Sequence, residues 1–312
     1  MEILENFKKS LTWADSLSIK VDVNITPKGI PGKGPYKLNF ILYRKYNLLQ
    51  WEGNIAATDC NGKTDPDNNH LIRKIINERE YFDAIGKPGL SPIGALITTD
   101  FNGIKEDLLD SDEFGGPLFA KIYGTNHKNI PDLLSDCNDI HLRQNQEDFN
   151  GTSCYILEGT TKYGKVTAWV APDKGYTALK WRIEKTGDDL VNDVPISRNE
   201  LILWDAQFEC KELQQVGDSI IPKIAIFDIN IKEKNGNNRS LHVVYILSDI
   251  QLNPDFNALG AFKIDLSEGA KVTVPESPGI KYIWKGGKIE PFVDGPTFEE
   301  IDKTIDQIKK QQ

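Results

Sequence analysis

The chain has 312 residues, of which 39% are hydrophobic and 27% charged, values typical of a globular protein with a sizeable core. The formal net charge of −9 argues against a nucleic-acid partner, because phosphate binding requires concentrated lysine and arginine. No apolar run approaches the roughly 18 residues that cross a bilayer, so we expect no transmembrane segment.

The N-terminal residues 2–13 place Leu4, Phe7 and Leu11 three to four positions apart, which predicts a short amphipathic helix. Charged residues stand where a secretory signal peptide has its apolar region. The sequence of a mature domain from which a signal peptide has been removed would show the same charged start. We interpret the chain as such a domain.

Alternation of apolar and polar residues predicts the next elements. Ile19, Val21 and Val23 alternate with charged or polar neighbours, as in a strand with one face in water. Further strands are expected near 37–43 and 48–55, followed by a polar loop over 58–70. Residues 71–82 fit either a helix or a strand, and we favour strands. Residues 104–109 are predicted to form a short helix.

From about residue 138 onward the sequence predicts a long antiparallel meander, with hairpin turns at Asn150-Gly151, at 172–175 and at 235–238. Two more short strands are expected at 271–274 and 280–284. The predicted strands of the meander are 139–147, 153–160, 165–171, 177–185, 199–211, 221–231 and 240–251.

The C-terminal residues predict an amphipathic helix. Thr297 and Glu300 form a capping box, and an apolar stripe follows at helical spacing. The stripe consists of Phe298, Ile301, Ile305 and Ile308. We therefore divide the chain into a single β domain, 1–295, and a helix within 296–312.

Four cysteines are present, and their spacing leaves both free thiols and disulfides open; they are Cys60, Cys137, Cys154 and Cys210. Cys137 and His141 have the spacing of a pair of zinc ligands, but two further ligands would be needed. An ordinary junction between a loop and a strand is the alternative there. No nucleotide-binding or hydrolase motif occurs, and the sequence predicts no catalytic residue, metal or cofactor.

Trp169, Tyr176 and Trp181 gather around one predicted hairpin. Leu179, Trp181 and Ile183 alternate with charged residues, which predicts that these three share a face. They fit an ordinary sheet core, or a concave apolar surface that holds a lipid. We expect one tryptophan to face the concave side and the other the outer side, with Tyr176 anchored at the turn.

The order of several motifs along the chain resembles the LolA/LolB-like superfamily of bacterial envelope proteins, the outer-membrane lipoprotein-sorting type. The motifs are Cys154-Tyr155, Tyr163-Gly164, WVAPDKGY at 169–176, Ile221-Pro222, LNPDFNALGAFKIDLSEGAKV at 252–272 and PGIKYIWKGGKIEP at 278–291. They cover about half the chain. The chain is longer than a minimal carrier, with extra residues around 186–240 and at the C-terminus.

The resemblance implies a mainly β fold of the α+β type: a large curved antiparallel sheet, or unclosed β-barrel, with a few helices as a lid. It implies a non-enzymatic binding protein, periplasmic or associated with the outer membrane, that holds a lipid, an acyl chain or a lipoprotein. The alternative is a protein-interaction or envelope-sensing module on the same fold. Strand phase and side-chain bulk, not the family, select the cavity candidates: Phe40, Leu42, Trp51, Trp169, Tyr176, Trp181 and Tyr245.

Overall fold

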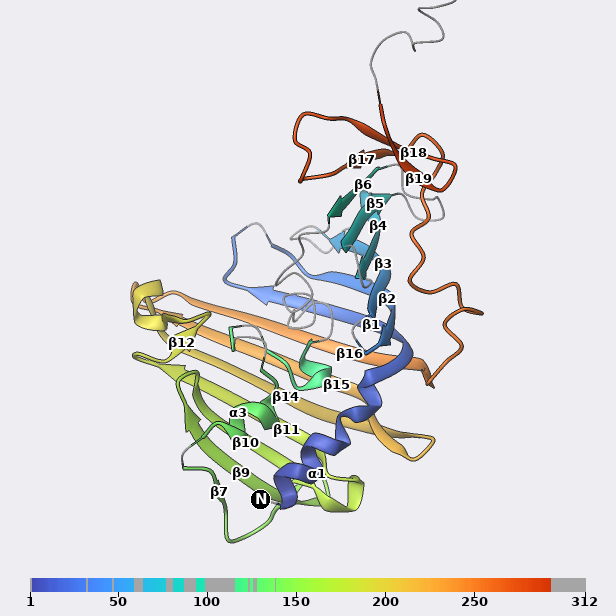
Figure 1. Ribbon diagram of the computed structural model, residues 1–312. Coiled ribbons are helices and arrows are strands. Elements are labelled where there is room, and N and C mark those ends of the chain that lie inside the picture. The colour runs from blue at the N-terminus through green and yellow to red at the C-terminus, as the bar shows by residue number, and fades with distance from the viewer. Residues whose placement is uncertain are drawn as a thin grey trace, which may run out of the picture.

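The computed structural model describes residues 2–58, 64–76, 81–86, 94–98 and 116–292, except 32, 47, 123, 126, 127 and 138. Of 55–58, 64–71, 81, 85 and 86 it describes the backbone alone. Most of these residues belong to one large curved sheet of 17 strands that does not close into a barrel (Figure 1). The mainly β fold class predicted from the sequence is confirmed.

The spatial order of the sheet differs from the order of the chain. From one edge it runs β7 and β8, then β9, β10, β11, β14, β15, β16, β1, β2, β3, β4, β5, β6, β17, β18 and β19. Neighbours are antiparallel except β6 and β17, which are parallel. A separate two-stranded sheet joins β12 to β13.

The first half of the chain contributes six strands: β1 (Ser16–Lys28), β2 (Tyr36–Lys45), β3 (Leu48–Thr58), β4 (Thr64–Ile76), β5 (Tyr81–Gly86) and β6 (Gly94–Thr98). The middle contributes β7 (His141–Leu142), β8 (Glu147–Phe149), β9 (Thr152–Thr161), β10 (Gly164–Ala171), β11 (Thr177–Thr186), β12 (Leu190–Val191) and β13 (Val194–Pro195). The remainder are β14 (Leu201–Val216), β15 (Ser219–Glu233), β16 (Asn238–Leu252), β17 (Lys271–Thr273), β18 (Tyr282–Lys285) and β19 (Lys288–Pro291).

Strand β1 lies in the middle of the sheet, between β2 and β16. Its alternation places Leu17, Ile19, Val21, Val23 and Ile25 on the buried face, each at most 1% exposed. Lys20, Asp22 and Asn24 between them are exposed or half-buried on the other face, as the period of two requires. The N-terminal strand therefore joins the meander to the β2–β6 half of the sheet.

A row of residues in direct register crosses the concave face. Trp181 of β11 lies opposite Phe208 of β14, Phe208 opposite Phe227 of β15, and Phe227 opposite Val243 of β16. The Trp181 ring lies 5.5 Å from that of Phe208 and 5.7 Å from that of Phe227, centroid to centroid. Such cross-strand aromatic pairs stabilise a sheet beyond the area they bury.

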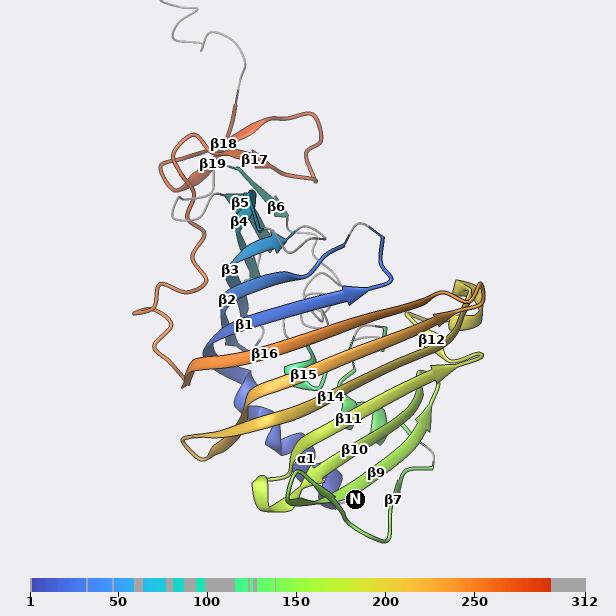
Figure 2. The ribbon, with the colours of Figure 1, turned by 180° about the vertical axis from the view of Figure 1, so that it is seen from behind.

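Short helices lie against this concave face, and in Figure 2, which shows the sheet from the other side, α1 lies behind the strands. They are α1 (Glu2–Ser10), η1 (Thr12–Asp15), η2 (Gly116–Phe119) and α3 (Ile130–Ser135). The acidic first turn and basic last turn of α1 suit the helix dipole. Asn129 caps α3 by accepting a hydrogen bond from the Asp132 amide, 2.8 Å away.

The strands β4–β6 and β17–β19 extend the sheet away from α1 (Figures 1 and 2). They carry a smaller core of their own, formed by Ile75, Phe82, Ala84, Ile97, Leu266, Ala270, Val272 and Trp284. The short 3-10 helices η3 (Pro172–Lys174) and η4 (Ile196–Asn199) belong to connections of the meander.

Three local predictions are wrong. Residues 139–147 form no continuous strand, because β7 is only two residues long and β8 starts at Glu147. The predicted loop over 58–70 contains the start of β4, whose pairing with β3 overrides the weak strand propensity of its polar residues. Leu179 lies on the face opposite Trp181, for a reason given below.

Other strand predictions are confirmed, including strands within 71–82 and the hairpins of the meander. The predicted helices at 104–109 and 297–310, and Cys60, lie outside the described residues. So does 296–312, and the division into 1–295 and a terminal helix stays a prediction.

Candidate functional site beneath the N-terminal helix

Five of the seven predicted cavity residues lie in the main core, on the concave face of the sheet. They are Phe40, Leu42, Trp51, Trp181 and Tyr245, all at most 3% exposed. They come from β2, β3, β11 and β16, and the rings of Phe40 and Trp51 lie 5.0 Å apart. Their side chains therefore fill the concave face, together with those of α1, η2 and α3.

Trp169 lies on the opposite face of the same hairpin. It packs against a small cluster that includes Ile156 and Ala171, whereas the neighbouring Leu157 and Val170 belong to the main core. Successive residues of a strand face opposite sides, so the two clusters lie on opposite faces. The indole Nε1 of Trp169 donates a hydrogen bond to Glu147 Oε2, 2.8 Å away.

A β-bulge explains why Leu179 leaves the face of Trp181. The register shifts between Trp169, opposite Lys180, and Val170, opposite Ala178. Leu179 is the extra residue on β11, and it joins the outer cluster while Ala178 joins the main core. A bulge of this kind places side chains that are two residues apart in the sequence on different faces of the sheet.

Tyr176 lies at the turn between β10 and β11. Its backbone has a φ of 60°, directly after Gly175 at 65°, so two successive left-handed residues reverse the chain. The Tyr176 amide donates to the Ala171 carbonyl over 2.9 Å. The half-buried side chain packs against the edge of the main core.

Next to Tyr176, a hollow of about 250 Å³ opens between the end of α1 and the tips of two hairpins. Beneath it lies a cavity of about 20 Å³, bounded on the inside by Trp181 and Phe208. The hollow and the cavity share Ser10, Trp13 and Thr177 as lining residues. Since one water molecule needs roughly 10–15 Å³ of such space, the inner cavity has room for little more than that.

Helix α1 closes the concave face mainly through apolar contacts. Leu4 is 2% exposed and Phe7 is fully buried, and Trp13 of η1 is 7% exposed. In the described part of the chain, the only ion pair of α1 joins Lys8 Nζ to Asp132 Oδ1 of α3 at 3.7 Å. Both side chains are partly exposed, and an exposed pair contributes about 1 kcal/mol or less. Burial of three large side chains, not polar bonding, holds the helix.

A fully buried lysine lies near the far ends of the same strands. Lys185 has no exposed surface, and its Nζ donates to the carbonyls of Gly124 and Leu190 at 2.9 and 3.0 Å. The Nζ also lies 4.8 Å from the ring centre of Trp204. Burial lowers the pKa of Lys185 to about 7.

A group of charged residues covers the outer face next to Trp169. Arg143 Nη2 donates to Glu158 Oε1 over 2.6 Å, and Arg143 also pairs with Glu147, the partner of the Trp169 indole. The hydrogen bond from Arg143 lowers the pKa of Glu158 to about 2. His141 Nε2 lies 3.2 Å from Glu158 Oε2. This network holds β7 and β8 against β9 and explains the polar surroundings of Trp169.

Cys137 and His141 have separate partners, and they do not converge on a shared site. The Cys137 thiol donates to the Leu133 carbonyl over 3.3 Å, while His141 turns toward Glu158. Within the described ranges no three His, Cys, Asp or Glu side chains gather as ligands of a metal ion. Cys137, Cys154 and Cys210 are free and buried thiols.

Sequence reasoning missed several residues of the concave core. Phe208 lies opposite Trp181, and Phe227 lies opposite Phe208. Both could have been found by aligning the strands of the predicted hairpins. Lys185 follows Trp181 and Ile183 at a spacing of two, which marks a buried position despite its charge. Trp13 follows the predicted apolar stripe of α1, and its place in the core comes only from the structure.

No protein-family model and no curated protein matches the chain. Among solved structures, a DUF1329 family protein from Desulfovibrio piger is 12% identical, with a TM-score of 0.39, over 81% of this chain and 93% of that one. LprF from Mycobacterium bovis is 10% identical, with a TM-score of 0.32, over 81% and 95%. MucB in complex with MucA(peri) is 8% identical, with a TM-score of 0.24, over 81% and 98%.

These likenesses are too remote to carry a conclusion about function. What the described residues show is the architecture expected from the LolA/LolB-like resemblance: an unclosed curved sheet with helices on its concave face. No helix in the described ranges is long and apolar enough to span a membrane.

Proposed function

We propose that the protein is a non-enzymatic envelope binding protein that takes up an apolar chain, such as the acyl chain of a lipid or lipoprotein, beneath α1. The observation that carries the proposal is the way α1 and η1 cover an apolar concave face through Leu4, Phe7 and Trp13. The hollow beside Tyr176 leads toward the small cavity under this cover. An acyl chain would enter there and displace the helix.

The energies make such an exchange feasible. Burial of a large apolar side chain contributes about 1.5–3 kcal/mol, so the three side chains hold α1 and η1 by roughly 5–9 kcal/mol. Each buried methylene of an acyl chain contributes about 0.8 kcal/mol. A chain with ten or more methylenes, at about 8 kcal/mol or more, therefore competes with the helix for the same surface.

Titration with a 16-carbon fatty acid that carries a fluorescent group tests this proposal. Phe7→Ala weakens the cover without removing a residue of the sheet, and we expect it to bind the probe about 10-fold more tightly or better than the wild type. Glu5→Ala changes the exposed side of the same helix and is the matched control, with unchanged affinity. Native mass spectrometry of the purified protein would identify any lipid already bound.

The small volume under α1 favours a second candidate, a protein-interaction or sensing module whose concave face is filled by its own side chains. Absence of bound lipid, together with no binding of the probe to either wild type or Phe7→Ala, would contradict the lipid-binding proposal and leave this candidate.

A further inference from the structure

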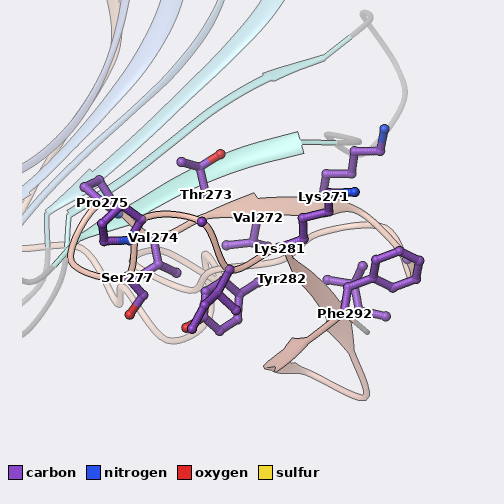
Figure 3. Close-up of a pocket in the computed structure, with 14 residues that line it drawn as sticks. Lys271, Val272, Thr273, Val274, Pro275, Ser277, Lys281, Tyr282 and Phe292 are labelled. Carbon is purple, nitrogen blue, oxygen red and sulfur yellow. The ribbon is translucent and has the colours of Figure 1, made fainter. Parts of the chain in front are cut away.

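The β17–β18 end of the sheet carries a second pocket, far from α1 in Figure 1 and independent of the proposed lipid site. Its volume is about 770 Å³, within the range of ligand-binding sites. Its wall consists of β17, the connection 274–281, the start of β18 and Phe292 (Figure 3). Most of the lining side chains are apolar, among them Val272, Val274 and Tyr282.

Two of these side chains are unusually exposed for their type. Ile280 is 53% exposed and Phe292 is 42% exposed, and both line the pocket. Exposed apolar side chains that gather around one hollow mark a surface that binds a partner. Figure 3 also shows Lys271 of β17 and Lys281 of the connection, and both side chains are exposed.

The described chain ends at this pocket, since Phe292 is both its last residue and part of the lining. Twenty residues follow, 293–312, which lie outside the described structure. Four of them, 293–296, precede the predicted helix and can reach at most about 14 Å. The helix that the sequence predicts from residue 297 is thus tethered next to the pocket.

The sequence of that helix matches the pocket in polarity and charge. Its apolar stripe of Phe298, Ile301, Ile305 and Ile308 spans about 15 Å along the axis. Its first turns carry Glu299, Glu300 and Asp302, opposite in charge to the lysines of the pocket. An amphipathic helix in an apolar groove is a common mode of recognition.

We propose that residues 297–310 of the same chain dock as a helix into the pocket of β17 and β18. The isoleucines then contact Val274, Ile280 and Phe292, and the acidic first turns lie near Lys271 and Lys281. The docked segment covers the exposed apolar surface at this end of the sheet. The interaction is intramolecular because the tether is short.

Hydrogen exchange of the full-length chain, read by mass spectrometry, tests the proposal. We expect amides of 297–310 to be protected in the wild type and to exchange at least 10-fold faster in Ile280→Asp and in Ile305→Asp. Ile280 is half-exposed and outside the three hydrophobic core clusters, so its substitution leaves the fold intact. Gln307→Asp adds the same charge to the opposite side of the predicted helix and should keep the protection.

Three outcomes would overturn the proposal. The first is exchange of 297–310 at the rate of an unstructured peptide in the wild type, which would leave the pocket to an external ligand. The second is protection that survives Ile280→Asp. The third is protection that falls on dilution of the protein, because the helix would then come from a second copy of the chain.

Discussion

Trp169 and Trp181 lie on adjacent strands of one hairpin and differ in burial, which makes them a natural pair for substitution. Trp181 is 1% exposed and contacts two phenylalanines, so Trp181→Ala should lower the free energy of unfolding by about 3–5 kcal/mol. Trp169 is half-buried with one hydrogen bond to Glu147, and Trp169→Ala should cost about 1–2 kcal/mol. Denaturant unfolding measures both values. Equal losses would contradict the difference in burial between the two tryptophans.

Lys185 makes stability depend on pH in the alkaline range. Its pKa is about 7 in the folded chain, against 10.5 for an ordinary lysine, so the unfolded chain binds more protons between these values. The contribution of Lys185 to stability therefore rises as the pH increases from about 7 toward 10.5. In Lys185→Met this rise should be absent, and thermal unfolding of both proteins at pH 7, 8 and 9 measures the difference. A parallel pH dependence in the two proteins would refute the buried, shifted lysine.

Glu158 makes stability depend on pH in the acidic range. Arg143 holds its pKa at about 2, below the ordinary 4.5, so its stabilising contribution is complete above about pH 4.5 and is lost as the pH falls toward 2. Glu158→Gln should be less stable than the wild type at pH 6, and the gap should narrow at pH 3. Thermal unfolding at the two pH values checks this, with Glu184→Gln, on β11 beyond β10, as a comparison.

Among the elements, α1 sets a threshold on the length of an acyl ligand if the proposed uptake is correct. The helix and η1 are held by about 5–9 kcal/mol, whereas a six-carbon acid offers four methylenes, or about 3 kcal/mol. We expect no binding of hexanoate and clear binding of hexadecanoate, with the onset between about 8 and 12 carbons. Calorimetric titration across the series measures it. Equal affinity for short and long chains would show that the site does not lie under α1.

How far the sequence predicts each element depends on where its hydrogen-bonding partner lies. Strands such as β1 and β15 were predictable because their own alternation matches one buried face. The early part of β4 was not, since its polar residues become a strand only by pairing with β3. The bulge that separates Leu179 from Trp181 could not be predicted from their alternation either. A register shift depends on the opposing strand.

The candidate site, too, could be predicted only in part from the sequence. Strand phase selects Phe40, Trp51, Trp181 and Tyr245, which lie on the concave face, although whether any of them contacts a ligand stays a prediction. The hollow beside Tyr176 could not be predicted, because it arises where α1 meets two hairpin turns distant in sequence. The closeness of Phe292 to Val272 and Ile280 around one pocket likewise needed the structure.

For the molecule as a whole, three buried thiols report on different regions of the large sheet. Cys137 follows α3, Cys154 belongs to the outer cluster and Cys210 to the main core. Burial raises their pKa values, to about 11 for Cys137 and Cys154 and to about 12 for Cys210. We expect none of the three to react with iodoacetamide at pH 8 in the native protein.

If the sheet unfolds cooperatively, all three thiols should become reactive over the same range of denaturant concentration. Peptide mapping after pulsed alkylation assigns the reaction to each cysteine. Reaction of Cys154 at a lower denaturant concentration than Cys210 would show instead that the β7–β9 edge opens by itself.

The position of β1 between β2 and β16 has a consequence for how the protein is made. Residues 16–28 leave the ribosome before their partner strand, 238–252, which follows more than 200 residues later. During synthesis one edge of β1 is therefore left without its neighbour, with five buried-face aliphatic residues beside it. Pairings over such sequence separations form slowly, and exposed strand edges invite aggregation. The chain cannot complete its sheet until most of it has been synthesised, so a chaperone that shields β1 would raise the yield of folded protein.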